Sequence, residues 1–309
     1  MNNGQYLGID IGGTFIKLGV VTDQGEVLQR HKVSVDRSEA EHIMATLINA
    51  IKEFCFSMGT GAESFAGIGI SAPGSIDSIN GRVALNGGNV PNWSGTEVFA
   101  ALKEEFGLPV AIANDGNCAA LGEAWTGAAK GCSEVVCITL GTGVGGGIIS
   151  GGKLVEGRTG FAGEIGHFPT HAGDGALCVC GRRGCYERYA STSALVRKAS
   201  AVNPDWDSGY NIFKSLDEGD ADAATIVDGW LDEIAYGIAG LVHIFNPEVV
   251  LIGGGVSAQE KFVITPVKER VLSLVMPDFA ESLEVKSAEL GNDAGMVGAV
   301  KHLLDSKGE

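Results

Sequence analysis

The sequence predicts an α/β protein built from two similar domains, and three observations support this prediction. A strand, a glycine turn and a second strand open the chain, and the same pattern returns after residue 134. Segments with apolar residues at helical spacing lie between the strands. Of the 309 residues, 45% are hydrophobic and 47 are glycine, which is sufficient for two hydrophobic cores joined by tight turns.

The first half begins with three expected strands between residues 6 and 35, separated by a glycine turn and by the turn 23–25. A helix follows a capping box of Ser38 and Glu41. Its apolar face comprises Ile43, Leu47, Ile51 and Phe54. We then expect a strand over 66–71, a long loop to 93, a helix over 96–106 that ends at Gly107, and a strand over 110–113 leading into a helix.

The second half repeats the opening, with strands expected over 134–140, 144–150 and 153–155. A long helix over 223–245, a buried strand over 249–252 and a helix over 259–276 opened by the turn 253–255 follow. The last helix, 294–304, is expected to pack on the first domain. The predicted domains are therefore 1–113 plus 294–309, and 114–293, with a cleft between them.

Three cysteines with Cys-x-Cys-x4-Cys spacing predict a zinc-binding knuckle: Cys178, Cys180 and Cys185. A disulfide and buried free thiols are the alternatives. The other four of the seven cysteines stand singly, which is typical of a reduced compartment and favours metal binding. A histidine would complete a closed, structural tetrahedral set, and spacing alone leaves His167 and His171 as candidates.

Three glycine turns are candidate phosphate sites, because backbone N–H groups in such turns can converge on an anion. Their residues are Asp10, Gly12, Gly13 and Thr14; Gly141, Thr142 and Gly143; and Gly253, Gly254 and Gly255. Each turn alone is compatible with a simple hairpin, but the three together indicate a polyphosphate. The chain has no Walker lysine, and Thr14 leads into a strand rather than a helix, so neither a P-loop nor a Rossmann site is expected. Asp10 is expected to hold Mg²⁺, directly or through water, unless it is only a hydrogen-bond acceptor at the strand end.

Asn114 and Asp115 follow the last strand of the first half, where helix capping is one explanation for them. The other is that Asp115 accepts the proton of a substrate hydroxyl as its oxygen attacks a γ-phosphorus. A group of bidentate polar side chains is suited to a neutral polyol such as a sugar, although surface ion pairs would also explain its glutamates. The group comprises Asn89, Asn114, Asp115, Glu164, His167 and Glu187.

The formal net charge of −16 opposes binding to nucleic acid or to an anionic membrane surface. The first residues lack the basic and apolar regions of a signal peptide, and no apolar run is long enough for a membrane span. A cytoplasmic location is therefore expected.

Taken together, these motifs resemble the ROK family (repressors, open reading frames, kinases), in particular its bacterial glucokinases. The resemblance spans nearly the whole chain and is most specific where the cysteine motif follows Gly163-Glu-Ile-Gly-His167. The other matching segments are Asp10-Ile-Gly-Gly-Thr14, Gly69-Ile-Ser-Ala-Pro-Gly74, Asn114-Asp115, Leu140-Gly-Thr-Gly-Val-Gly-Gly-Gly147, Cys178-Val-Cys-Gly-Arg-Arg-Gly-Cys185-Tyr-Glu187 and Gly253-Gly-Gly-Val-Ser257.

The resemblance implies an actin-like, duplicated ribonuclease H-like fold that binds Mg-ATP and phosphorylates a hexose, with glucose and its 6-hydroxyl as the first expectation. It implies that Asp115 is the catalytic base, that Asn114, Glu164, His167 and Glu187 contact the sugar, and that His167 joins the three cysteines on zinc. A homodimer or homotetramer is expected. N-acetylmannosamine, N-acetylglucosamine, allose, mannose and fructose are alternative substrates. A sugar-sensing transcriptional regulator is another alternative, although Asp10 lies too near the start of this sequence for the family's winged-helix module.

Overall fold

A computed structural model describes residues 4–35, 43–85, 90 and 92–308 and divides the chain into two compact units. Unit 1 comprises residues 1–130, 154–163 and 292–309, and unit 2 comprises residues 131–153 and 164–291. Unit 1 extends beyond residue 113, where the sequence placed the boundary. The reason is that helix α3 (Asp115–Trp125) packs against α10 (Ala294–Lys307), which is the last helix of that unit.

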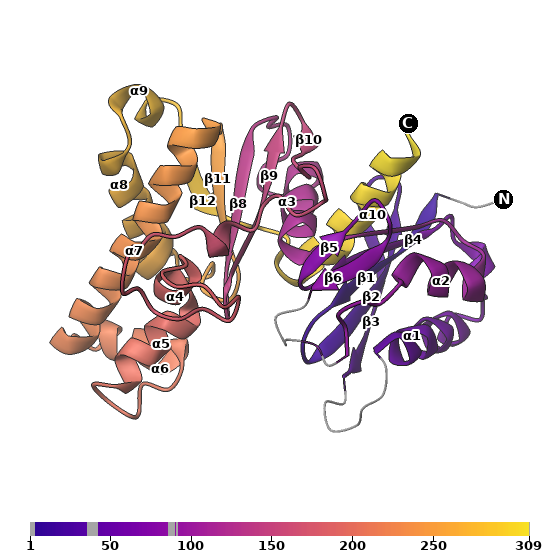
Figure 1. The fold of residues 1–309 in the computed structure, drawn as a ribbon, viewed down its shortest axis with the longest axis horizontal. Helices are drawn as coiled ribbons and strands as arrows, with labels where there is room; N and C mark the ends of the chain where they lie inside the picture. Colours follow the sequence, from indigo (N-terminus) through magenta and orange to yellow (C-terminus); the bar gives the residue numbers. More distant parts are fainter. Residues whose placement is uncertain (1–3, 36–42, 86–89, 91, 309) are drawn as a thin grey trace. The chain divides into compact units, whose positions relative to one another are not determined.

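Unit 1 contains a five-stranded sheet (Figure 1). The first three strands of the chain pair antiparallel, and the other two strands run parallel to the first strand. Its order is β3 (Val27–Ser34), β2 (Phe15–Thr22), β1 (Gln5–Ile11), β4 (Ile68–Ala72) and β7 (Val110–Asn114). These strands confirm the prediction for the first half. The carboxyl ends of β1, β4 and β7 meet at one edge, because the three strands are parallel.

Helices cover both faces of this sheet. On one face α1 (Ile43–Ser57) and α2 (Val98–Phe106) enclose a core with Leu7, Ile9 and Ile11 of β1. The other face carries α10, which comes close because Gly8 has no side chain: a Cβ there would lie 2.7 Å from the Met296 carbonyl oxygen. The last helix therefore packs on the first unit, as predicted.

The helix predictions in unit 1 hold where they can be compared. All four residues of the predicted apolar face are buried in α1, whereas Ser38 and Glu41 lie outside the described residues. Gly107 ends α2 with φ of 66° and donates its N–H to the Lys103 carbonyl. The long loop predicted before α2 is wrong in part, since it contains the hairpin β5 (Ser75–Asp77) and β6 (Arg82–Leu85). Strands this short carry too little alternation to be recognised.

Unit 2 repeats the strand order of unit 1 (Figure 1). Its sheet runs β10 (Lys153–Leu154), β9 (Val144–Ser150), β8 (Val135–Leu140), β11 (Val249–Gly253) and β12 (Glu284–Ser287). The pair β8–β9 is antiparallel, and β8, β11 and β12 are parallel, as are their counterparts β1, β4 and β7. The duplication predicted from the repeated motif is thus confirmed by topology.

The helices of unit 2 gather around α7 (Ala221–Phe245), whose buried Trp230 donates its indole N–H to the Ala190 carbonyl at 3.0 Å. Its neighbours are α4 (Glu187–Ala190), α5 (Thr192–Ser200), α6 (Gly209–Asp217) and α8 (Thr265–Leu274), followed by α9 (Pro277–Ala280). Short 3₁₀ segments at 62–64, 165–167 and 291–293 and a π-helical turn at Glu260–Ile264 complete the described elements.

The prediction that the turn 253–255 opens a helix is wrong. Residues after Gly254 form further turns, in which the Ser257 N–H and hydroxyl both donate to the Gly254 carbonyl, and helical structure begins only at the π-helical turn. A helix N-terminus therefore does not supply the anion site expected at these glycines. Within the described segments, no helix has the length and apolarity needed to cross a membrane.

Candidate active site

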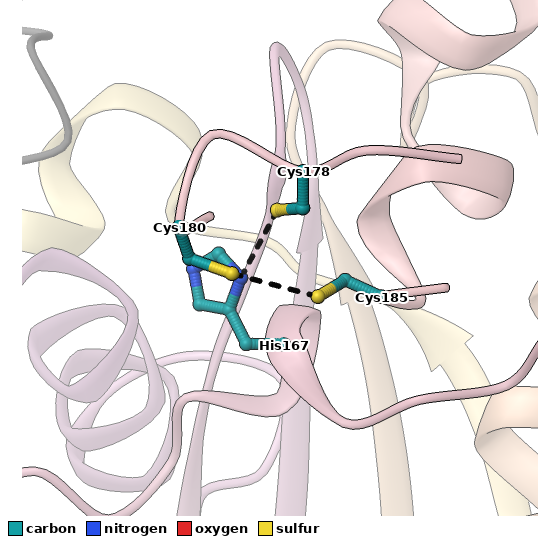
Figure 2. A group of neighbouring side chains, drawn as sticks. All are labelled: His167, Cys178, Cys180 and Cys185. Atoms are coloured by element: carbon teal, nitrogen blue, oxygen red, sulfur yellow. Dashed lines mark hydrogen bonds between the residues drawn. The ribbon is translucent and has the colours of Figure 1, made fainter. Parts of the chain in front are cut away.

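Four side chains that could ligate a metal gather in unit 2, as the sequence predicted (Figure 2). They are His167, Cys178, Cys180 and Cys185, and their ligand atoms all lie within 4.8 Å of one another. The knuckle is closed by backbone hydrogen bonds from the Cys178 N–H to the Arg182 carbonyl and from the Gly181 N–H to the Cys178 carbonyl. Gly181 adopts φ of 82°, which a residue with a side chain rarely does.

The spacing of these atoms fits a tetrahedral metal. With metal–sulfur bonds of about 2.3 Å and a metal–nitrogen bond of about 2.0 Å, the edges of a tetrahedron measure roughly 3.5–3.8 Å. The Sγ atoms of Cys180 and Cys185 lie 3.6 Å apart, and Cys178 Sγ lies 3.6 Å from His167 Nδ1 (Figure 2). Three sulfurs and one imidazole nitrogen are donors that zinc prefers, so the residues fit a closed structural zinc site.

The structure also distinguishes the two candidate histidines. His167 directs Nδ1 at the sulfurs, whereas its Nε2 lies 4.0 Å from a carboxylate oxygen of Glu164. His171 instead stacks on Tyr189, with 3.6 Å between ring centroids, and its Nε2 faces Glu233 at 3.5 Å. Geometry therefore selects His167 for the cluster, in agreement with the family resemblance.

Glu187 connects the cysteine cluster to the second glycine turn. The Cys178 thiol donates to Glu187 Oε1 at 2.9 Å, and burial together with this hydrogen bond raises the pKa of that thiol in the metal-free chain. The other carboxylate oxygen lies so close to Gly143 that a Cβ there would stand 2.5 Å from it. A side chain at this position would therefore have to displace the Glu187 carboxylate.

Three of the predicted sugar-binding side chains, Glu164, His167 and Glu187, thus lie in one region of unit 2. Partial burial, reinforced by the nearby Glu187 carboxylate, raises the pKa of Glu164, while His167 acts in the opposite direction. A metal on Nδ1 would leave the proton on Nε2, which makes His167 a donor beside two acceptors. Such a set of one donor and two acceptors suits the vicinal hydroxyls of a sugar.

The glycine turns of unit 2 border a cavity of about 550 Å³. Gly141 and Thr142 follow β8 and Gly255 follows β11, so the parallel pairing of these strands brings the two turns to the same edge. Leu140 and Val196 provide apolar lining, and Arg197 and Asp207 provide polar lining. A cavity of this size and mixed character is typical of a small-molecule site.

In unit 1, the predicted phosphate turn joins β1 to β2 and is closed by a hydrogen bond from the Gly12 N–H to the Phe15 carbonyl, 2.8 Å long. Asp10 lies just before the turn. Its Oδ1 accepts a hydrogen bond of 2.7 Å from the Ser71 hydroxyl, and its Oδ2 lies 3.1 Å from Lys17 Nζ. The strand-end acceptor role that the sequence left open is thus observed, and the other lone pair of each oxygen leaves room for a metal-bound water.

Asn114 and Asp115 lie at the start of α3, at the carboxyl end of β7. The Asn114 side chain caps the helix by accepting from the Gly116 and Asn117 N–H groups and donates to the Gly74 carbonyl at 3.0 Å. Capping is thus observed for Asn114, and Asp115 is an exposed carboxylate whose Oδ1 accepts from the Gly116 N–H at 2.9 Å. Both residues belong to unit 1, and Asn89 lies outside the described residues.

Sequence reasoning missed two partners of Asp10, namely Lys17 and Ser71. A signal for Lys17 was present, because a hairpin in which Ile11 pairs with Ile16 also places Lys17 opposite Asp10 on the same face. Ser71 offered no comparable signal, since its position beside Asp10 depends on the parallel pairing of β1 with β4.

The repeated sheet, with a glycine turn at the carboxyl edge of each copy, defines the actin-like class of two-domain α/β proteins. Within that class the chain belongs to the ROK family, whose profile matches residues 6–305.

The relatives that it matches include sugar kinases. It is 36% identical to a glucokinase of Thermotoga maritima, with 98% of both chains covered, and 32% identical to a beta-glucoside kinase of Listeria monocytogenes, with 96% of this chain and 97% of the relative covered. Among solved structures it resembles a ROK family glucokinase from Streptomyces griseus in complex with glucose and AMPPNP, at a TM-score of 0.82 and 35% identity, with 96% and 98% of the two chains covered.

Proposed function

We propose that this protein, a hexokinase-type phosphotransferase of the ROK family, transfers the γ-phosphoryl group of ATP to a hydroxyl of a hexose, with glucose as the first candidate substrate. The observation that carries the proposal is the cavity of unit 2, which is bordered by two glycine turns at the carboxyl edge of the sheet. Its volume of about 550 Å³ suits a nucleoside, and the turns at its border offer N–H groups to phosphates.

In the proposed reaction the hexose hydroxyl, with the 6-hydroxyl of glucose as first candidate, forms a bond from its oxygen to the γ-phosphorus. The bond between that phosphorus and the β–γ bridging oxygen breaks, and ADP leaves with the electron pair. The hydroxyl proton passes to the carboxylate of Asp115, whose exposed position at the first turn of α3 leaves it accessible to a ligand. Mg²⁺ bound with ATP would offset phosphate charge, and Asp10 would contact it through water.

Glu164, His167 and Glu187 are the proposed sugar-binding residues of unit 2, and Asn114 contributes from unit 1. Carboxylates and imidazole pair with sugar hydroxyls that would otherwise lose hydrogen bonds on burial, each at a cost of about 1–3 kcal/mol. His167, Cys178, Cys180 and Cys185 would hold the proposed zinc, which would fix the tautomer of His167 and hold the loop that leads to Glu187.

A coupled assay of ADP release tests the proposal, with ATP and a panel of glucose, mannose, fructose, allose, N-acetylglucosamine, N-acetylmannosamine and a β-glucoside. We expect turnover with glucose. No turnover with any of these sugars would contradict the kinase assignment, and turnover with another sugar alone would contradict the choice of glucose.

Asp115→Asn tests the proposed base. Loss of general base catalysis should lower kcat by about 10²–10⁴-fold while glucose still binds. Asp222→Asn is the matched control, because Asp222 is also an exposed aspartate in the first turn of a helix, and it should keep wild-type turnover. Wild-type kcat in Asp115→Asn would exclude this carboxylate as the base.

A further inference from the structure

The glycine turns, threonine hydroxyls and carboxylate proposed above to hold phosphate carry no positive charge, although Arg197, whose guanidinium donates to the Arg188 carbonyl, lines the cavity of unit 2. Yet the transferred phosphoryl group spreads negative charge over three oxygens in its transition state. From the structure of unit 1 we infer that Lys17 is the side chain that contacts these phosphate oxygens and offsets their charge. This inference rests on the proposed kinase function.

The hairpin β1–β2 determines where Lys17 lies. Its backbone pairs with that of Asp10, and residues paired across an antiparallel ladder project to the same face of the sheet. The ammonium is then held at two points, 3.1 Å from Asp10 Oδ2 and 3.2 Å from Asn292 Oδ1. It is therefore fixed at the end of the hairpin that carries the turn Gly12–Thr14, rather than extended into solvent.

The contacts of this ammonium are compatible with phosphate binding. An ammonium has three donors, and among the described residues the bonds to Asp10 and Asn292 use two of them. The Lys17 side chain is 30% exposed, so a ligand at the turn can reach it without any rearrangement of the core. The N-terminus of α10 also lies beside Asp10, since a Cβ on Gly295 would stand 2.7 Å from Asp10 Oδ1.

A purely structural role explains the position of Lys17 less well. Partly exposed ion pairs of this kind contribute only about 0–1 kcal/mol to stability, so fold stability alone gives little reason for a lysine here. The neighbouring Lys32 shows the contrast. It pairs with Lys17 across β2 and β3, but its ammonium lies over the Phe15 ring at 3.5 Å rather than beside a carboxylate.

The test compares Lys17→Met, Lys17→Gln and Lys17→Arg with the matched control Lys32→Met in the ATP and glucose assay. Removing one preorganised charge should lower kcat by about 10²–10³-fold in both neutral variants. Lys17→Arg should recover at least a tenth of the wild-type value, and Lys32→Met should stay within twofold of it. Melting temperatures of all variants should lie within a few degrees of the wild type. If Lys17 had only a structural role, a large loss in kcat would be accompanied by a large fall in melting temperature.

Nucleotide binding provides a readout that does not depend on turnover. Lys17→Gln should bind AMPPNP at least tenfold more weakly than the wild type does, but AMP, which lacks the β- and γ-phosphates, with unchanged affinity. Equal weakening of both ligands, or a kcat within twofold of the wild type in Lys17→Gln, overturns the role of Lys17 while leaving the kinase proposal intact. A wild-type protein that turns over no sugar overturns the kinase proposal itself.

Discussion

Gly295 is the position at which the smallest chemical change should have the clearest effect on the proposed phosphate site. The residue lies in the first turn of α10, against the carboxylate of Asp10. A Cβ at residue 295 would stand 2.7 Å from Asp10 Oδ1 and 3.0 Å from Ser71 Oγ. Since an ordinary carbon–oxygen contact measures about 3.3 Å, Gly295→Ala should displace the carboxylate by roughly 0.6 Å.

This displacement determines the expected loss of activity. The carboxylate cannot simply rotate away, because Ser71 holds one oxygen at 2.7 Å and Lys17 holds the other at 3.1 Å. A misplacement of about 1 Å can cost about 10²-fold in rate, so a shift of roughly 0.6 Å should cost on the order of tenfold in kcat/KM for ATP. The free energy of unfolding should fall by about 0–2 kcal/mol, because a gain of about 1 kcal/mol in helix propensity opposes an overpacking cost of about 1–3 kcal/mol.

The assay is steady-state kinetics with varied ATP at saturating glucose, together with thermal unfolding. Gly229→Ala is the matched control: Gly229 also lies in a helix, α7, but a Cβ there meets no atom within 4 Å. It should be stabilised by about 0.5–1 kcal/mol and keep full activity. If Gly295→Ala retains kcat/KM for ATP within twofold of the wild type, the argument that Asp10 needs this close approach is refuted.

Three further predictions concern other parts of the molecule. Cys180→Ser should lose zinc on dialysis against a chelator, as measured by elemental analysis, and its KM for glucose should rise at least tenfold. Cys132→Ser, outside the cluster, should retain the metal, and equal zinc content in the two variants would contradict the site. Val196→Trp should fill the cavity of unit 2 and raise KM for ATP at least tenfold with KM for glucose unchanged, and an unchanged KM for ATP would exclude the cavity as the nucleotide site. Burial lowers the pKa of His302 in the folded chain, although Glu156 and Asp305 act in the opposite direction. The unfolded chain therefore binds the proton more readily, and the free energy of unfolding should fall as pH decreases below about 6.5. His302→Gln should lose less stability than the wild type between pH 7 and 5.5 in urea unfolding, and an equal loss would mean that His302 is not responsible.

The sequence predicted most of the fold because its motifs repeat. The glycine turns after β1 and β8 occupy equivalent places, and the strand order of the two sheets is the same. The segment from α4 to α6 was missed, since helices of four to nine residues give little periodic signal. The helix expected over 259–276 is present as the π-helical turn and α8, but the turn 253–255 does not lie at its N-terminus, because the backbone turns again before the π-helical segment begins.

The sequence predicted those parts of the candidate site whose residues lie close together along the chain. The cysteine cluster forms within one short segment plus His167, so spacing alone identified its sulfurs. The choice between His167 and His171 required geometry, because both lie within reach along the chain. Glu187 illustrates the limit: its contact with Gly143 joins two motifs that are separated along the chain, and only the packing of α4 against the turn after β8 brings them together.

Lys17 shows how strand register, rather than any motif, can place a functional group. Ile16 and Leu18 are buried in the core shared with α1, so the intervening Lys17 must project to the opposite face, where α10 begins. A slip of β2 by one residue against β1 would put this lysine into the apolar core and remove the ammonium from Asp10. The buried isoleucine and leucine on one face therefore also fix the polar pair on the other. The alternation of apolar and polar residues along β2, which stabilises unit 1, thus also places Lys17 beside the turn proposed to bind phosphate.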